Sequence, residues 1–152
     1  MTKLFYLSEI IKFAVEKEIE SEKLYQQLSE QTNDLTLKAL FEKLVGEEKK
    51  HETFYANMLS HVQEKQSPGV KEDNEYNAYM QELITSSRST LPLSAAELSD
   101  MNAAIDYAIN REKDSILFYV GLKNLVPSHA QDKIDIIIKE EAKHIVMLSG
   151  LK

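Results

Sequence analysis

Apolar residues recur at intervals of three and four along four long stretches of the chain, which is the spacing of one face of an α-helix. The stretches predict helices over about residues 8–31, 33–61 and 100–125, and from 127 almost to the C-terminus. Ser8 is expected to cap the first helix and Asn33 or Asp34 to start the second, while Ser128 and Gln131 have the spacing of a capping box. The pattern therefore predicts an all-α protein.

The predicted helices are joined by connections of unequal length. Short connections within residues 8–62 and within 100–150 predict two antiparallel hairpins. Residues 63–99 would then form a long crossover between the hairpins, with a short additional helix expected at about 71–85. We expect a single domain over residues 1–152, folded as an antiparallel four-helix bundle.

The two predicted hairpins repeat each other. IKFAVEKEIESEKLY at residues 11–25 aligns with IDYAINREKDSILFY at 105–119, with Ile, Ala, Glu, Ser and Tyr in common at an offset of 94. VGEEKKH at 45–51 aligns with IKEEAKH at 138–144 at an offset of 93. Because polar as well as apolar residues coincide, the sequence indicates a duplicated helical hairpin.

Ionisable residues interrupt the apolar stripe of every predicted helix near its middle. They are Glu18, Glu48, His51, Glu112, Glu141 and His144. Burying a carboxylate costs several kcal/mol, and the stripes contain no Arg or Lys that would neutralise four of them. The carboxylates are therefore either protonated or bound to cations. Two divalent ions would balance four carboxylates while both imidazoles stay neutral.

These residues also match a known ligand pattern. One Glu from each of two helices and Glu-x-x-His from each of the other two is the ligand set of dimetal sites in helix bundles. A single Glu-x-x-His motif would be weak evidence for a metal site. Here both motifs occur at equivalent positions of the repeat, which supports a dimetal site. Mixed carboxylate and imidazole ligands favour iron, with manganese as the alternative, while zinc usually has fewer ligands.

Two tyrosines follow the ligand candidates Glu18 and Glu112 by seven residues each. Tyr25 and Tyr119 are expected either to hydrogen-bond ligand carboxylates or to be core aromatics with polar tips. The other polar residues near the stripes are expected to be packing, rim or surface residues: Glu22, Glu47, Tyr55, His61, His129 and Glu140.

Composition narrows the classes of function. The formal net charge of -7 disfavours a nucleic-acid-binding protein. The chain has no cysteine, which excludes disulfides, iron–sulfur clusters and thiolate zinc sites within it. It also has no apolar run of membrane-spanning length and no signal sequence at its start, so we expect a cytoplasmic protein that does not enter a membrane.

On these motifs the chain resembles the ferritin-like superfamily, and most closely its rubrerythrin branch in a form without the rubredoxin domain. The resemblance covers residues 8–62 and 100–148. It implies two iron ions, with terminal ligands Glu18 and Glu112, bridging ligands Glu48 and Glu141, and one His on each iron, His51 and His144. It also implies an external electron donor and a homodimer.

The chain departs from the rubrerythrin pattern at two points. It lacks the Cys-ligated iron that delivers electrons, and it lacks the extra carboxylate about one turn from the ligand Glu of the third helix, where Ala108, Ile109, Ser115 and Ile116 stand. The leading interpretation is a di-iron oxidoreductase that reacts with peroxide or dioxygen, as a rubrerythrin-like peroxidase does. The alternatives are an iron-binding or ferroxidase module and a di-iron oxidase or hydroxylase of an organic substrate.

Overall fold

The computed structural model describes residues 6–62, 82, 98, 100–124 and 126–152. Within this part of the chain there are four long α-helices and no strand. The helices are α1 (Leu7–Gln31), α2 (Leu35–Ser60), α4 (Met101–Lys123) and α5 (Gln131–Ser149), with the 3-10 turn η2 (Ser128–Ala130) before the last of them. The predicted all-α, ferritin-like four-helix fold is confirmed.

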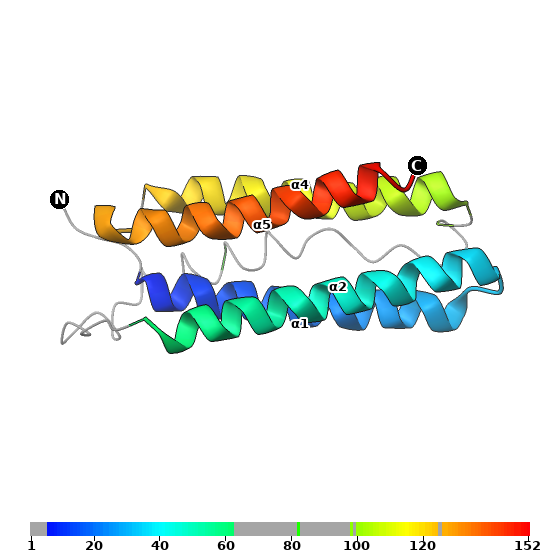
Figure 1. Ribbon diagram of the computed structural model, residues 1–152, viewed down its shortest axis with the longest axis horizontal. Coiled ribbons are helices and arrows are strands. Elements are labelled where there is room, and N and C mark those ends of the chain that lie inside the picture. Colours follow the sequence, from blue (N-terminus) through cyan, green and yellow to red (C-terminus); the bar gives the residue numbers. More distant parts are fainter. Residues whose placement is uncertain (1–5, 63–81, 83–97, 99, 125) are drawn as a thin grey trace.

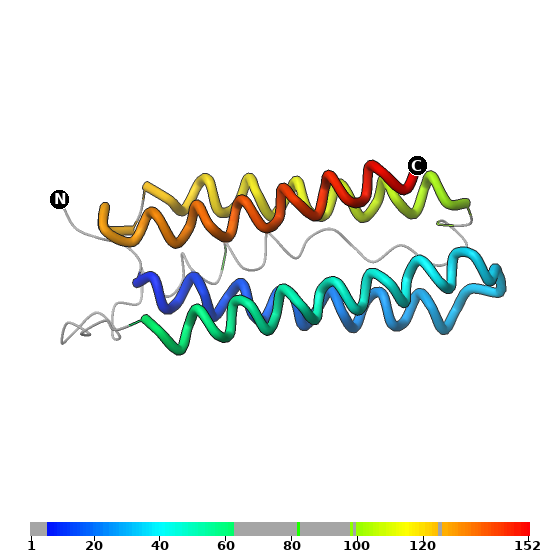
Figure 2. The backbone as a smooth tube through the Cα atoms, viewed as in Figure 1, coloured from blue at the N-terminus to red at the C-terminus, as the bar shows by residue number. Residues whose placement is uncertain are grey.

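The helices pair as two antiparallel hairpins, α1 with α2 and α4 with α5 (Figure 1). The two hairpins lie against each other with their long axes aligned, and the tube view shows the four helices running along the long axis of the bundle (Figure 2). This arrangement brings the middles of all four helices to one level. Of the short helix expected at about 71–85, only Glu82 is described, and it is helical; the other residues of this range lie outside the described part of the chain.

Side-chain caps start two of the helices where the sequence predicted. Asp34 accepts hydrogen bonds from the backbone N–H of Thr36 at 2.8 Å and of Leu37 at 3.2 Å, at the start of α2. At the start of α4, Asp100 accepts from the N–H of Ala103 at 2.8 Å. Each carboxylate satisfies N–H groups that have no partner inside the helix.

Two predicted helix caps are wrong. Ser8 lies inside α1, which begins at Leu7 with Tyr6 in the cap position. Ser128 does not form a capping box, because η2 occupies residues 128–130 and α5 begins only at Gln131 without a side-chain cap. Backbone bonding explains the second case: the N–H of Ala130 donates to the carbonyl of Pro127 at 2.8 Å, which closes a tight turn there.

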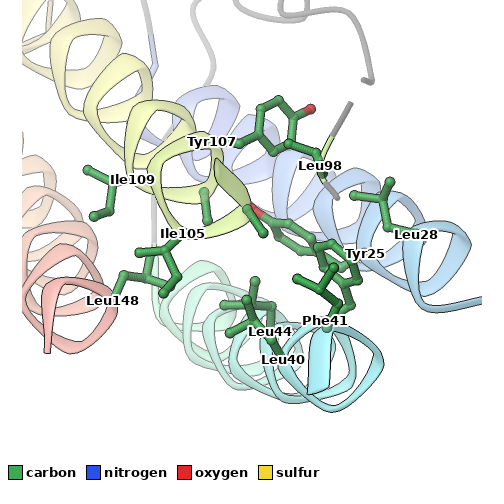
Figure 3. Close-up of a cluster of buried hydrophobic side chains, with 13 residues drawn as sticks. Tyr25, Leu28, Leu40, Phe41, Leu44, Leu98, Ile105, Tyr107, Ile109 and Leu148 are labelled. Atoms are coloured by element: carbon green, nitrogen blue, oxygen red, sulfur yellow. The ribbon is translucent and has the colours of Figure 1, made fainter. Parts of the chain in front are cut away.

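Apolar side chains form two clusters, one towards each end of the bundle. The first includes Ile11, Tyr55 and Tyr119, and the second includes Tyr25 and Leu148. Figure 3 shows the second cluster, in which side chains from different helices interdigitate. Each fully buried large side chain contributes about 1.5–3 kcal/mol to folding, so these clusters fix the helices on both sides of the polar middle.

None of the described helices is long and apolar enough to cross a lipid bilayer.

Candidate metal centre

All six predicted ligands are buried and meet at the centre of the bundle. The exposed fractions of the four glutamates are at most 5%, and those of the two histidines are at most 8%. Glu18 comes from α1, Glu112 from α4, and the two Glu-x-x-His motifs come from α2 and α5. Their helical spacing of three places each Glu beside its His on the inward face.

Each histidine faces a different group of carboxylates. His51 Nδ1 lies 3.8 Å from Glu18 Oε1, 3.8 Å from Glu141 Oε2 and 4.0 Å from Glu48 Oε2. His144 Nδ1 lies 3.1 Å from Glu112 Oε1 and 3.5 Å from Glu48 Oε1. The two imidazole rings are 5.0 Å apart. The centre therefore has two halves, and Glu48 is close to the histidines of both.

Three overlapping groups of residues have ligand atoms within 4.8 Å of one another. They are Glu18 with His51 and Glu141, Glu112 with Glu141 and His144, and Glu48 with both histidines. Glu141 belongs to two groups, the one with Glu18 of α1 and the one with Glu112 of α4. Glu48 lies in the group that contains both histidines. This overlap is the arrangement that bridging carboxylates would need.

Many donor and acceptor atoms of the centre have no hydrogen-bond partner among the described residues. They are both carboxylate oxygens of Glu48, Oε2 of Glu112 and of Glu141, Nδ1 of His51, and both ring nitrogens of His144. Leaving a buried polar atom unpaired costs about 1–3 kcal/mol, more if it is charged. Cations among these atoms would satisfy them, so the residues fit a pair of metal ions.

Without metal, the centre would hold protons that water-exposed groups release at neutral pH. Burial, together with the carboxylates of Glu141 and Glu48, raises the pKa of Glu18 well above its usual value. Burial and Glu112 raise the pKa of Glu141 to about 8. Burial lowers the pKa of His51. For His144 the effect of burial is outweighed by Glu112 and Glu48, which raise its pKa to about 9.

Tyr55 has a role that the sequence analysis did not assign to it. It was expected to be a packing or rim residue, but its hydroxyl donates a hydrogen bond to Glu141 Oε1 at 3.2 Å, across the interface between α2 and α5. The bond orients a proposed ligand. Tyr55 follows Glu48 by seven residues and His51 by four, and this spacing on one helix face could have identified it.

The two tyrosines singled out in the sequence belong to the apolar clusters. Tyr119 is fully buried, and its hydroxyl has no hydrogen-bond partner in the part of the chain that the structure describes. Tyr25 packs with Leu28 and Phe41 at the opposite end of the centre (Figure 3).

None of the remaining polar candidates belongs to the three groups of possible ligands. Glu47 and Glu140 pair with the lysines three residues after them on the helix surface, and His61 and His129 are exposed. Glu22 is half-buried on α1, where it lines a cleft of about 320 Å³ together with residues of α2. Burial and the neighbouring Glu52 raise its pKa to about 7.

A four-helix bundle whose centre gathers Glu residues and two Glu-x-x-His motifs defines the class of ferritin-like di-iron carboxylate proteins. The sequence model of the rubrerythrin family matches residues 9–152, and the chain belongs to this family. No curated protein matches it.

A solved structure also resembles this chain. It is described as that of a ferritin-like diiron-carboxylate protein from Thermotoga maritima, is 26% identical, and aligns with a TM-score of 0.53 over 97% of this chain and 95% of its own. The family, the fold and the Glu/His groups together support an iron-binding, di-iron type of protein.

Proposed function

We propose that the centre binds two iron ions and that the protein is a rubrerythrin-like oxidoreductase that uses them to reduce a small oxidant. The observation that carries the proposal is the set of buried, unpaired Glu and His atoms at the meeting point of the four helices. Glu18 and His51 would hold one ion, and Glu112 and His144 the other. Glu48 and Glu141 would bridge them, and manganese is the alternative metal.

Hydrogen peroxide takes two electrons to become water, which is the number that two bound ferrous ions supply. Dioxygen takes four, and a chain without cysteine has no Cys-ligated redox centre to add the others. The oxidant is therefore proposed to be peroxide, and an external donor, the expected partner, returns the electrons.

The residues around the centre would support this chemistry in two ways. Tyr55 holds Glu141 by a hydrogen bond, so one bridging carboxylate has a fixed orientation. The apolar clusters on both sides keep bulk water from the buried carboxylates, which strengthens their attraction for cations.

The first experiment measures metal content. Titration of metal-free protein with Fe(II) under anaerobic conditions, or with Mn(II), should end at two ions per chain. Glu141→Ala should weaken binding of both ions, because this residue belongs to two ligand groups. Glu140→Ala is the matched control, since the neighbouring carboxylate pairs with Lys143 at the surface. An end point of one ion or none would contradict the proposal.

The second experiment compares oxidants. Protein loaded with Fe(II) should be oxidised faster by stoichiometric hydrogen peroxide than by an equal concentration of dioxygen, as followed by stopped-flow absorbance of the ferric product. Iron should remain bound after oxidation. Faster oxidation by dioxygen would favour an oxidase or hydroxylase, and release of ferric iron would favour a ferroxidase module.

A further inference from the structure

Arg111 joins the two hairpins beside the metal centre. Its Nη2 donates a hydrogen bond to Ser21 Oγ at 3.0 Å, which connects α4 to α1. The guanidinium carbon lies 6.0 Å from the centre of the Tyr107 ring, on the preceding turn of α4. Ser21 is buried, and Arg111 is partly buried.

Both residues of this contact are neighbours of a proposed ligand. Arg111 directly precedes Glu112, and Ser21 follows Glu18 by three residues on the same face of α1. Glu18 and Glu112 belong to different hairpins, so the distance between them depends on contacts across the hairpin interface. The Arg111–Ser21 contact crosses this interface within one helical turn of both glutamates.

We propose that Arg111 is a positioning residue of the metal centre: through Ser21 it holds α1 against α4, so that Glu18 and Glu112 reach their two metal ions together. This inference rests on the proposed function. A guanidinium suits the role because its planar donors are fixed in direction and remain charged. Burial alone would lower the pKa of Arg111, but Tyr25 and Tyr107 raise it above its usual value.

The internal repeat supplies a matched comparison. Lys17 occupies the position equivalent to Arg111, and Phe13 the position equivalent to Tyr107. The Phe13 ring packs against that of Phe118 at 4.5 Å. Ser115, the equivalent of Ser21, donates a hydrogen bond from its hydroxyl to the backbone carbonyl of Arg111 at 2.9 Å. The two sides of the centre therefore differ, and Lys17 is the natural control residue.

The test measures Co(II) affinity, by competition with a chelating dye, and the visible absorption of the Co(II)-loaded protein. Arg111→Met and Ser21→Ala should each lower the affinity about tenfold, as loss of a group that orients a ligand typically does. The Co(II) affinity of the double variant should be no lower than that of the weaker-binding single variant, because both changes break the same contact. Lys17→Met should stay within about twofold of the wild type.

Several outcomes would overturn the proposal. If Arg111→Met lowers the melting temperature of the metal-free protein but leaves Co(II) affinity and spectrum unchanged, Arg111 only stabilises the fold. If Arg111→Lys retains wild-type affinity, positive charge and not the contact with Ser21 is responsible. Additive losses in the double variant would also refute it. Should Arg111→Met fail to fold, Ser21→Ala decides. A wild-type protein that binds no Co(II) would instead refute the proposed function itself.

Discussion

At the scale of single residues, the two buried tyrosines of one apolar cluster differ in the hydrogen bonding of their hydroxyls. Tyr55 and Tyr119 are both fully buried. The hydroxyl of Tyr55 donates to Glu141, whereas that of Tyr119 has no hydrogen-bond partner among the described residues. Since both side chains contribute similar apolar area, the hydrogen bond can be tested separately from packing.

Tyr55→Phe should lower metal affinity about tenfold, because Glu141 loses the group that orients it. Tyr119→Phe is the control and should change affinity by no more than about twofold. The measurement is competition with a chelator of known affinity, at a pH where both variants are folded. Equal losses in the two variants would show that the Tyr55 hydroxyl does not act on the centre.

At the scale of the helix, two exposed glycines lower helix stability although no close neighbour requires the absence of a side chain there. Gly46 in α2 and Gly121 in α4 are exposed and lie inside helices, where glycine costs about 0.5–1 kcal/mol relative to alanine. A Cβ atom added at either position would meet nothing within 4 Å. Both positions therefore accept a larger residue without strain.

Gly46→Ala and Gly121→Ala should each raise the free energy of unfolding by about 0.5–1 kcal/mol, because alanine loses less backbone entropy on folding. Denaturant unfolding followed by circular dichroism measures this change. Gly150→Ala is the control: it lies in the C-cap of α5, where its Cβ would meet Met147 O at 3.4 Å, and no gain is expected. Destabilisation by Gly46→Ala would indicate that this surface of α2 is covered in the native protein.

At the scale of the whole molecule, the buried charges of the centre connect stability to pH and to metal. The metal-free bundle gathers four carboxylates and two imidazoles between its apolar clusters. Their shifted pKa values mean that the folded and unfolded chains bind different numbers of protons at the same pH.

Metal-free protein should lose stability as the pH rises from about 5 to 9. Glu141 has a pKa of about 8 in the folded state against 4.5 for the unperturbed group, so its contribution is complete below 4.5 and is lost towards 8. His144 acts in the same direction between 6.5 and about 9, and Glu18 has a raised pKa as well. His51 opposes them, since its pKa is lowered. Melting temperatures across this range test the sum, and a rise with pH would contradict it.

Bound metal should reverse this loss of stability at neutral pH, because the ions bind the folded chain and replace the protons. A free metal concentration 100 times the dissociation constant adds about 2.7 kcal/mol to the free energy of unfolding. Thermal melting at pH 7 with and without saturating Mn(II) measures the gain. Mg(II), which rarely takes imidazole ligands, is the control. An unchanged midpoint with Mn(II) would argue against a buried dimetal site.

The sequence alone was sufficient to predict the four helices, the duplicated hairpin and the inward orientation of the six Glu and His residues. This information is local: the spacing of residues along one helix decides which side chains share a face, whatever the helix packs against. The start of α2 at Asn33 or Asp34 could be predicted for the same reason, because a cap depends only on the residues that follow it, and Asp34 is the cap. The caps predicted at Ser8 and Ser128 were wrong, because backbone geometry at the helix end decided the boundary.

Only the tertiary structure decided which side chains meet between hairpins. That Tyr55 contacts Glu141, and that Arg111 reaches Ser21, depends on the rotation and axial offset of helices far apart in sequence. Periodicity carries no information about these offsets, since a rotation of one helix by a few tens of degrees leaves its stripe facing inward but changes its partners. The six candidate ligands could thus be predicted from the chain, while the contacts that would orient them arise from packing.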